Sequence, residues 1–527
     1  MVPVLIVGGG PVGLALAIEL GSRGVACTLI EQGSGRIVDA KMFATGIRTV
    51  EFCRRWGIAD RVRDWGFPRD FPFDNVFVTR LAGYELARIP MPSIADTPPI
   101  AQSPENFAHC PQFVFDRILA DKARALASVS LRYNCRLASF DQTPGFVEVR
   151  LEGGETLRAA YVVGCDGYSS TVRRQLGIAM LGDEHLNRAI NIMFRTPELS
   201  ALHDKGNAGR YVLIGTEGPW ASLTAADGRE QWRLMLYEDK LEPREAVRAA
   251  VGRDFEFEIL TVGVWVRRNL VAERYRSGRV FLAGDAVHVM PPNGGLGMNT
   301  GIADAVDLGW KLAALIQGWG GEGLLASYEA ERRPAGLRAC QEAMKNFERI
   351  TPRRHFPHIH ENSAEGRATR DELGRRLAVS MRSAWDNPLN THLGYRYDRS
   401  PVCIADGAPP PEPEDSRVYV QSSHPGGRAP HAWLAEGRST LDLFGAGFTL
   451  LRFGSQEDLS VEARRRGVPL NSVDIDDPAI AALYERKLVL VRPDGHVAWR
   501  GDALPVRRDA LLERVTGEFQ LKEEAAS

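Results

Sequence analysis

Short apolar runs that precede helical patterns occur in two separate parts of the chain. Pro3–Val7 and Val25–Ile30 are such runs near the N-terminus, and Tyr161–Gly164 and Arg279–Ala283 are similar runs further along. From Met298 onward, apolar residues recur at helical spacing. Short apolar runs between helices are typical of strands buried in a parallel sheet. The pattern therefore predicts an α/β domain assembled from both parts of the chain.

Residues 182–269 show a different pattern, in which short alternating or β-rich runs are separated by turn signals such as Asp227–Gly228. This pattern predicts an antiparallel sheet inserted into the α/β domain. The segment from about 67 to 110 has no clear period, and we expect it to add strands and loops on the same side. The predicted strands are Ile190–Arg195, Tyr211–Gly215, Ala221–Ala225, Trp232–Tyr237 and Phe255–Trp265.

A Pro-rich acidic stretch, residues 401–415, predicts a linker before the last part of the chain. Residues 416–527 then predict elements in the order β-α-β-α-β-β-α, with a hairpin across Asp494–Gly495. The sequence contains no cysteine after Cys403, which excludes disulfide exchange in this unit.

Length and composition limit the class of protein. A chain of 527 residues with 44% hydrophobic and 25% charged residues is expected to form two or three soluble domains. The formal net charge of -2 gives no reason to expect nucleic acid or an anionic membrane as a partner. Seven cysteines without a C-x-x-C pair favour the cytoplasm and indicate no metal site. Val2–Ile18 is uncharged but interrupted by glycines and a proline, so we predict neither a signal peptide nor a membrane span.

The first apolar run ends in the glycine-rich turn GGGPVG, which matches G-x-G-x-x-G. The second run ends in Glu31, close to the ~20-residue interval expected for an acid that binds ribose. Strand, turn, helix, strand and acid together predict a dinucleotide site, and Glu31 favours FAD or NAD over NADP. The turn residues assigned to the cofactor are Gly8, Gly10, Pro11, Val12 and Gly13.

A second candidate ligand-binding stretch begins where the apolar run Arg279–Ala283 ends. Gly284–Asp285 places a carboxylate at the C-terminal end of a predicted strand, where open α/β sheets bind ligands. The loop Val289–Gly297 contains two prolines and three glycines and leads into a helix. A stiff loop at a helix N-terminus suits a ligand that becomes anionic, such as a reduced flavin. The alternative, an ordinary turn with a capping aspartate, does not explain the length and rigidity of the loop.

The whole stretch GDAVHVMPPNGGLGMNTGIADAVDLGWKL resembles the second FAD fingerprint of the single-component flavin aromatic hydroxylases, the relatives of para-hydroxybenzoate hydroxylase and phenol hydroxylase. The resemblance implies that Asp285 binds a ribityl hydroxyl of FAD. It also implies that the carbonyl of Pro292 faces the reacting ring of the substrate. Backbone groups around the flavin would come from Gly295, Gly297, Met298 and Asn299.

Four further positions would contact FAD if the resemblance holds. Lys41 stands where the family often has an arginine at the pyrophosphate, and Arg48 is the second basic candidate. Gln112 matches a glutamine at the phosphate–ribityl region, and Asp166–Gly167 resembles the family's DG motif. The alternatives are a solvated basic face, an exposed glutamine at a helix start and a turn aspartate.

In this family the antiparallel sheet roofs the substrate pocket. The resemblance therefore makes Tyr211, Trp220, Trp232 and Trp265 candidates for lining the pocket, with Tyr211 a catalytic candidate beside Pro292. The alternative for each aromatic residue is a packing role.

The resemblance covers essentially the whole chain and implies an α/β fold in three parts. A Rossmann-like FAD-binding domain takes residues 1–181, with substrate-side strands at about 67–110, and returns over 270–400. An inserted antiparallel-sheet substrate domain takes 182–269. After the linker, a thioredoxin-like C-terminal domain takes 416–527, with packing or homodimer formation as its expected role.

The implied activity is hydroxylation of a phenol-like aromatic substrate with dioxygen and NAD(P)H. FAD would stay bound, and a flavin C4a-hydroperoxide would transfer the oxygen. NAD(P)H would bind transiently, because the sequence has no second Rossmann motif. Other FAD enzymes of the same fold remain alternatives, namely an epoxidase, a Baeyer–Villiger-type oxygenase, a reductase or a halogenase, although the W-x-W-x-I-P signature of halogenases is absent. A non-catalytic flavoprotein is the remaining class.

Overall fold

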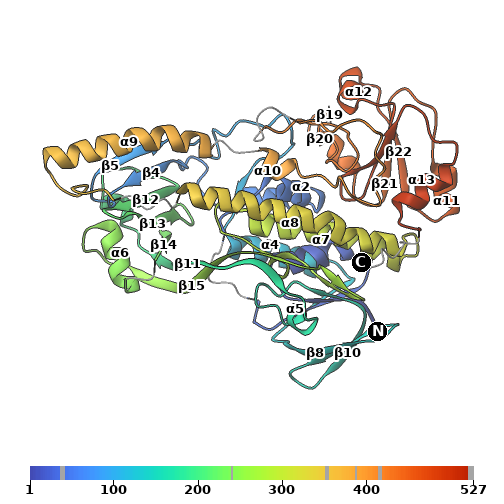
Figure 1. Ribbon diagram of the computed structural model, residues 1–527, viewed down its shortest axis with the longest axis horizontal. Helices are drawn as coiled ribbons and strands as arrows, with labels where there is room; N and C mark the ends of the chain where they lie inside the picture. Colours follow the sequence, from blue (N-terminus) through green and yellow to red (C-terminus); the bar gives the residue numbers. More distant parts are fainter. Residues whose placement is uncertain (36–41, 239–240, 351–354, 386–388, 413–417, 520–527) are drawn as a thin grey trace.

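The computed structural model describes residues 1–35, 42–238, 241–350, 355–385, 389–412 and 418–519. Within these residues the chain forms two large sheets and a smaller C-terminal sheet. The antiparallel sheet lies at one end of the molecule and the C-terminal unit at the other (Figure 1). The long helices α7 (Leu296–Ile316) and α8 (Glu322–Ile350) run between them.

The first large sheet contains parallel strands from both parts of the α/β domain, as predicted. Its order is β16-β17-β10-β1-β2-β7, and the antiparallel strands β9 and β8 continue from β10. The predicted strand Tyr161–Gly164 is the last part of β10, whose first part belongs to the predicted hairpin. The bounds are β1 Val2–Val7, β2 Cys27–Glu31, β7 Val129–Tyr133, β8 Leu137–Gln142, β9 Val147–Leu151, β10 Thr156–Gly164, β16 Arg276–Ser277 and β17 Val280–Leu282.

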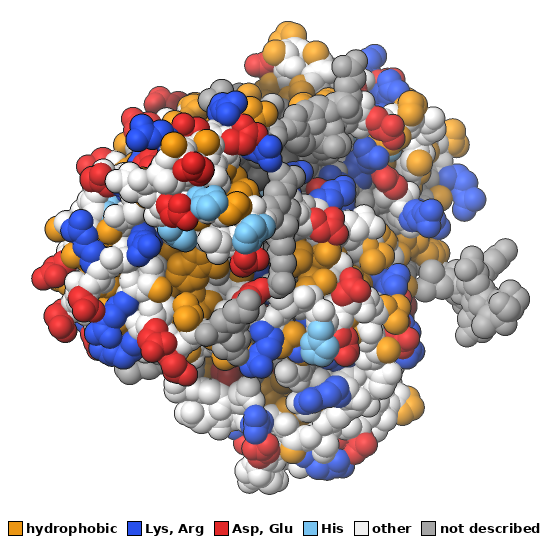
Figure 2. Space-filling model, turned by 60° about the vertical axis from the view of Figure 1, so that its left-hand side comes forward, with side chains coloured by type: hydrophobic (Ala, Val, Ile, Leu, Met, Phe, Trp, Pro, Cys, Tyr) orange, Lys and Arg blue, Asp and Glu red, His pale blue; other side chains and the backbone are white. Residues whose placement is uncertain are grey.

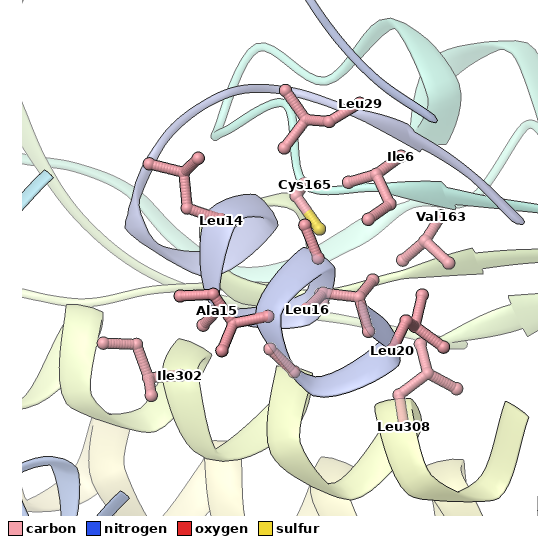
Figure 3. Packing of buried hydrophobic residues seen from close by; sticks show 14 of the residues in the cluster. Ile6, Leu14, Ala15, Leu16, Leu20, Leu29, Val163, Cys165, Ile302 and Leu308 are labelled. Carbon is pink, nitrogen blue, oxygen red and sulfur yellow. The ribbon is translucent and has the colours of Figure 1, made fainter. Parts of the chain in front are cut away.

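Helix α1 (Pro11–Gly21) packs between this sheet and α7. The close approach depends on Gly309, because a Cβ there would lie 2.7 Å from the Cβ of Glu19. Apolar side chains fill both sides of α1, which explains why its sequence is apolar nearly all round. The packing shown in Figure 3 involves Leu14, Leu16 and Leu20 of α1, Ile6, Leu29 and Val163 of the strands, and Ile302 and Leu308 of α7.

The second large sheet has the order β18-β15-β11-β14-β13-β12-β4-β5. Its neighbours are antiparallel except β12 and β4, which are parallel. The segment from 67 to 110 supplies β4 and β5, as predicted, and β18 comes from the stretch after Asp285. The bounds are β4 Asn75–Val78, β5 Glu85–Ile89, β11 Met180–Arg195, β12 Arg210–Gly215, β13 Gly218–Ala225, β14 Gln231–Leu236, β15 Glu258–Ala272 and β18 His288–Val289.

The predicted strands of this sheet are confirmed, but two of them are much longer than predicted. β11 and β15 pair from Arg195–Glu258 at one end to Met180–Ala272 at the other, across an irregularity between Asp183 and Asn187. The extra residues of β11 are largely exposed, those of β15 are buried or half-buried, and neither set alternates in polarity. Hydrophobic periodicity therefore gave no signal for them.

Each face of the second sheet is covered by a helix. Tyr211 and Leu213 face a core that includes α6 (Pro243–Val251), whereas Val212 and Ile214 face a core that includes α9 (Ala364–Trp385). Helix α9 lies along β5 (Figure 1), and a Cβ on its Gly374 would stand 2.2 Å from the carbonyl oxygen of Leu86. Residues of even and odd number on β12 thus have different surroundings.

The C-terminal sheet has the order β22-β21-β23-β24, with β21 parallel to β22 and antiparallel to β23. Along the chain, its strands and helices follow the predicted order β-α-β-α-β-β-α. The predicted linker differs from expectation in its described part, because Val402 is fully buried and the amide of Ile404 donates to the carbonyl of Ala498 at 2.8 Å. The bounds are β21 Phe448–Arg452, α11 Ser460–Arg465, β22 Leu470–Asp474, α12 Pro478–Tyr484, β23 Leu488–Val491, β24 Val497–Gly501 and α13 Arg508–Val515.

Basic and acidic side chains are interspersed over the face shown in Figure 2. None of the helices that the structure describes has the length and apolar character needed to cross a membrane. Likewise, no group of three or more His, Cys, Asp or Glu side chains within the described ranges is arranged to hold a metal ion.

Candidate functional site

A cavity of about 1700 Å³ is lined by residues of both large sheets. Its lining also includes the N-terminal end of α7, part of α8 and the short helix α10 (Leu389–Leu393). Pockets for one small molecule usually measure ~300–1,000 Å³. The cavity therefore has room for a large cofactor and a second ligand beside it.

The glycine turn lies at one end of this cavity. A Cβ on Gly10 would point into open space, because none of the described atoms lies within 4 Å of that position. Gly10 is also the N-cap of α1, and no side chain in the described structure caps this helix end. Its unpaired N–H groups and positive dipole end suit a pyrophosphate.

Gly8 and Gly13 serve the packing around the turn. Gly8 has φ 110°, and a Cβ on Gly13 would lie 2.0 Å from the carbonyl oxygen of Gly8. Gly13 is buried and is outside the described lining of the cavity, whereas Pro11 and Val12 belong to that lining. Of the three motif glycines, Gly10 is thus the one whose missing side chain leaves room for a ligand.

Glu31 ends β2 and lines the cavity beside the turn. Its carboxylate accepts from the amides of Gly9 and Gly33, at 2.7 Å each. A carboxylate offers about four lone-pair positions, so two remain for ribose hydroxyls.

Asp285 and the start of α7 meet the glycine turn from the other side. Asp285 lies in a short 3₁₀ turn, is exposed, and lines the cavity. The contact is close, because a Cβ on Gly301 would lie 2.9 Å from the Cα of Gly284 and 2.7 Å from Val12. The two fingerprints of the sequence are therefore packed directly against each other.

Gly295, Gly297 and Met298 line the cavity at the N-terminus of α7. Gly295 is the N-cap and has φ 65°, which favours glycine. The carbonyl of Pro292, also in the lining, accepts from the amide of Gly295 at 3.1 Å. This turn fixes the direction of the carbonyl and leaves its second lone pair available.

Asn299 has a different place from the one predicted, since the described lining of the cavity does not include it. Its Oδ1 accepts from the amide of Gly46 at 2.8 Å and from Oγ1 of Thr49 at 2.7 Å. Its Nδ2 donates to the carbonyl of Gly295 at 2.6 Å. Asn299 thus joins the start of α7 to the start of α2 (Ile47–Arg55).

Asp166 and Gln112 line the cavity, whereas Lys41 lies outside the described residues. Oδ2 of Asp166 accepts from the amide of Thr171 at 2.7 Å and from that of Val172 at 3.1 Å. Oδ1 of Asp166 is buried and has no hydrogen-bond partner among the described residues.

Arg48 does not reach the cavity lining that the structure describes. Its guanidinium bonds Glu51 at 2.8 Å and the carbonyl of Asp494 in the C-terminal unit at 2.7 Å. Its assignment to the FAD pyrophosphate is therefore wrong. The sequence shows a basic residue at a helix start, but it does not show the distant carbonyl that engages this residue.

Tyr211 is likewise wrongly assigned to the pocket. The residue is fully buried, its hydroxyl donates to the carbonyl of Gly206, and its ring packs near Trp232 at 6.4 Å. Burial raises the pKa of its hydroxyl far above the usual range. Of the four aromatic candidates, Trp265 is the one found in the described lining, and Trp220, Trp232 and Tyr211 are not in it.

The polar residues that the second sheet does present to the cavity lie in a row across four strands. Asn75 of β4 is opposite Arg210 of β12, Arg210 is opposite Thr224 of β13, and Thr224 is opposite Arg233 of β14. All four line the cavity. This row was not predicted from the sequence, because strand alternation separates the two faces of a sheet without showing which face borders a cavity.

A cluster of buried charged side chains joins the elements that form the site. Asp304 of α7 bonds His288 at 2.7 Å and Nε of Arg332 at 2.7 Å, and it accepts from the amide of Gly284 at 3.1 Å. Burial alone would raise the pKa of Asp304, but His288 and Arg332 lower it. The carboxylate therefore stays charged and ties the strand end before Asp285 to α7 and α8.

The residues present fit FAD by their own geometry. The glycine turn leaves space at Gly10, Glu31 retains free acceptor positions, and Asp285 is exposed to the cavity beside the uncapped start of α7.

Comparison with known proteins identifies two matching family models. Residues 1–343 match "FAD binding domain", and residues 422–519 match "Aromatic-ring hydroxylase, C-terminal". Among curated relatives, aklavinone 12-hydroxylase of Streptomyces purpurascens is 33% identical over 98% of this chain and 98% of its own length.

Solved structures are also similar to this chain over nearly its whole length. The rebeccamycin biosynthetic enzyme RebC with reduced flavin is 40% identical, with a TM-score of 0.91 over 98% of this chain and 99% of its own. A ternary complex of aklavinone-11 hydroxylase with FAD and aklavinone is 30% identical, with a TM-score of 0.82 over the same shares of the two chains.

Proposed function

The chain belongs to the FAD-dependent aromatic hydroxylases, and from that membership we propose that it uses NAD(P)H and dioxygen to hydroxylate an activated, phenol-like aromatic substrate through a flavin C4a-hydroperoxide. The observation that carries the proposal is the continuity of the cavity. One space connects the glycine turn at Gly10 with the row of polar residues on the second sheet. A cofactor and an aromatic substrate can therefore occupy it together.

FAD supplies the redox chemistry, and the chain supplies the contacts that hold it. In this proposal the start of α1 receives the pyrophosphate, Glu31 accepts from the ribose, and Asp285 accepts from a ribityl hydroxyl. The N–H groups of Gly297 and Met298 face the edge of the ring system that becomes negative on reduction. Fixed dipoles stabilise such a charge without having to reorient.

Pro292 is proposed to act on the substrate through its carbonyl. One lone pair is already used by the amide of Gly295. The second can accept from an aromatic hydroxyl and hold the substrate at a fixed distance from the flavin site. A rigid Pro-Pro turn suits this role, because a reacting group displaced by ~1 Å can lose about 100-fold in rate.

The size of the cavity favours a substrate with several fused rings. A volume of about 1700 Å³ is well above the ~300–1,000 Å³ that is usual for one small molecule, so the cavity can admit a substrate of several rings beside the cofactor. One relative was solved with FAD and aklavinone together. We therefore propose a polycyclic phenol as the substrate class for this chain.

The test is a screen of the purified, FAD-loaded protein with naphthols, hydroxyanthraquinones and simple phenols. NADH and NADPH consumption is followed with each compound, and products are identified by mass after reaction under ¹⁸O₂. We expect a multi-ring phenol to stimulate consumption and to gain one labelled oxygen atom. NAD(P)H oxidation without oxygen transfer to any of these compounds would favour a reductase. Oxygen inserted next to a ketone would favour a Baeyer–Villiger-type oxygenase.

A further inference from the structure

His392 belongs to α10, the short helix that covers one edge of the cavity. Residues 389–392 of this helix are part of the cavity lining. The helix lies beside α2 (Figure 1), and the guanidinium of Arg338 on α8 donates to the carbonyls of Asn390 at 2.9 Å and Gly394 at 2.7 Å. The backbone that carries His392 is therefore anchored at the cavity by α8.

Packing holds the imidazole of His392 in place. Its ring meets the ring of Phe107 edge-on, with centroids 4.8 Å apart and an angle of 88° between the two planes. The next residue, Leu393, is buried in a small core with Ile47 of α2 and Tyr419. His392 itself is 9% exposed, so more than nine-tenths of its surface is covered.

Two helix N-termini meet beside His392. Gly46 is the N-cap of α2, and Asn299 lies at the start of α7. A Cβ on Gly46 would stand 3.0 Å from Nδ1 of His392 and 3.1 Å from Oδ1 of Asn299. Because a helix N-terminus carries partial positive charge, these surroundings disfavour a charged imidazole and favour an anionic ligand.

Neither ring nitrogen of His392 has a hydrogen-bond partner among the described residues. Neither nitrogen is sealed from solvent, so a molecule in the cavity can reach the ring. A neutral imidazole offers one N–H donor and one acceptor. Polar groups that are this deeply buried usually have a partner, and where the protein gives none, a ligand or an ordered water molecule is the usual explanation.

We propose that His392 donates its N–H to the pyrimidine edge of the flavin ring and so stabilises reduced FAD more than oxidised FAD. Reduction by a hydride adds two electrons and one proton to the ring, which leaves one negative charge at this edge. A hydrogen bond to a charged acceptor is stronger than one to a neutral acceptor. The inference rests on the proposed function, which places this edge at the first turn of α7.

His392 acts here as a neutral donor. Burial lowers the pKa of its imidazole to about 4, because the charged form loses its contact with water. At neutral pH the ring therefore carries a single N–H, and the nearby helix N-termini oppose a second proton. The stabilisation then depends on the position of this N–H and does not require an imidazolium ion.

Three substitutions of His392 and one control separate loss of the donor from loss of packing. His392→Phe keeps an aromatic ring against Phe107, and His392→Leu keeps an apolar side chain, but both lack an N–H. His392→Gln restores a neutral N–H donor. Thr391→Val is the matched control, because it removes a hydroxyl from the preceding residue of α10, which also lines the cavity.

The measurement is the reduction potential of the bound FAD, recorded at pH 7 against a reference dye without NAD(P)H or substrate. The dissociation constant of oxidised FAD and the melting temperature of the apoprotein are measured in parallel. In His392→Phe and His392→Leu we expect reduced FAD to lose ~10–100-fold in affinity relative to oxidised FAD, which lowers the potential by ~30–60 mV. His392→Gln should recover most of this fall, and Thr391→Val should match the wild type.

A loss of less than about tenfold in both donor-free variants would overturn the proposal. Equal losses in His392→Gln and His392→Phe would do the same, as would equal losses in Thr391→Val and His392→Phe, because they mark a disturbance of α10. If both donor-free variants no longer bind oxidised FAD, the group acts on both redox forms alike, and the proposal also fails.

The potential is measured without turnover, so this proposal and the proposed function can fail separately. If the potential depends on His392 but no tested phenol is hydroxylated, the role of His392 stands and the reaction assignment fails. If a phenol is hydroxylated but the potential is the same in the wild type, His392→Phe and His392→Leu, the reaction stands and the role of His392 fails.

Discussion

Two glycines of the same motif have different roles: Gly10 leaves space for a ligand, and Gly13 allows close packing of α1. Gly10→Leu should place a side chain where the pyrophosphate is proposed to lie, and the protein offers open space there. We expect FAD affinity to fall by at least about 100-fold, the equivalent of ~3 kcal/mol, while the melting temperature of the FAD-free protein stays the same. FAD retention after gel filtration and thermal unfolding of the apoprotein measure the two effects.

Gly13→Ala is the matched control. Its Cβ would meet the carbonyl oxygen of Gly8 at 2.0 Å, so α1 would have to move away from the sheet. We expect the apoprotein to lose ~1–3 kcal/mol of stability, the usual cost of overpacking. Equal melting temperatures for the Gly13→Ala apoprotein and the wild-type apoprotein would contradict this assignment.

At the scale of single residues, the sequence predicted the site residues whose positions follow from the pattern of short apolar strands. The glycine turn, Glu31, Asp166 and Asp285 are found at the cavity because each lies at the end of a strand of the parallel sheet or within three residues after it. Tyr211 and Arg48 were misassigned for the opposite reason. The partners that engage them, the carbonyls of Gly206 and Asp494, are contacts that no periodicity encodes.

Among the elements, the start of α7 depends on α2 through Asn299. Asn299→Ala removes the acceptor for Gly46 and Thr49 and the donor to Gly295. We expect a loss of ~1–3 kcal/mol in the free energy of unfolding, because buried backbone groups lose their partners. FAD binding should weaken as well, since the loop before α7 loses an anchor. Chemical denaturation and FAD titration would test both effects.

The neighbouring residue provides the control for that substitution. The hydroxyl of Thr300 donates to the carbonyl of Leu296 within the same helix. Thr300→Ala should therefore cost less than ~1 kcal/mol and leave FAD affinity unchanged. Similar losses in the two variants would mean that the contact between α7 and α2 contributes little.

Helices and strands were predicted well where local sequence marks them, and less well where they depend on pairing between residues that are distant in sequence. Strands and helices of the C-terminal unit agree closely with the sequence pattern, because hairpin glycines and apolar runs mark them locally. β4 joins the second sheet by pairing with β12, which is far along the chain, and β5 is attached to the sheet only through β4. The first half of β11, which is largely exposed, likewise depends on its pairing with the second half of β15.

On the scale of the whole molecule, Glu51 joins the FAD-binding domain to the C-terminal unit. It bonds Arg48 at 2.8 Å and Nε of Arg428 at 3.1 Å. Burial would raise the pKa of Glu51, but Arg428 and Arg48 lower it to about 2. Because the pKa is lower in the folded state, this carboxylate contributes stability above pH ~4.5 and loses it as the pH falls toward ~2.

Glu51→Gln should reveal this contribution as a dependence on pH. We expect the variant to be less stable than the wild type by about 3 kcal/mol at pH 6, from a pKa shift of roughly two units or more. The difference should shrink progressively below pH 4.5. Thermal unfolding of both proteins at several pH values from 6 to 3 is the measurement. A difference that stays constant over this range would show that the charge of Glu51 is not the cause.

A second interdomain contact is a fully buried cluster around Arg492. Its guanidinium bonds Asp307 of α7 at 2.9 Å, Glu331 of α8 at 2.7 Å and Asp494 at 2.7 Å. Lys311 bonds Asp307 at 2.8 Å and Glu331 at 2.5 Å. Burial raises the pKa of Asp307 well above its usual range. Lys311 and Arg492 lower that pKa again, and these two cations are shared among the carboxylates of Asp307, Glu331 and Asp494.

Arg492→Met should destabilise the protein by ~3–5 kcal/mol, because it leaves buried carboxylates without their cation. Arg465→Met, which removes an exposed pair with Asp509 in the same unit, should cost less than ~1 kcal/mol. Denaturant unfolding measures the two values, and limited proteolysis in the 405–415 segment reports release of the C-terminal unit. An Arg492→Met protein as stable and as protease-resistant as Arg465→Met would contradict this role for the cluster.

Helix α7 contributes residues to two separate sets of contacts. Its first turn faces the proposed flavin site, and Asp307 further along, which also pairs with Lys311, bonds Arg492 of a domain that is distant in sequence. A chimera that takes residues 422–519 from a relative would therefore inherit the charge pattern of one parent on α7 and α8 and that of the other on the C-terminal sheet. Such a graft is compatible only when both parents carry matching charges at this junction. Exchange of the C-terminal domain in evolution or engineering is therefore constrained by side chains of α7, the helix whose first turn faces the proposed flavin site.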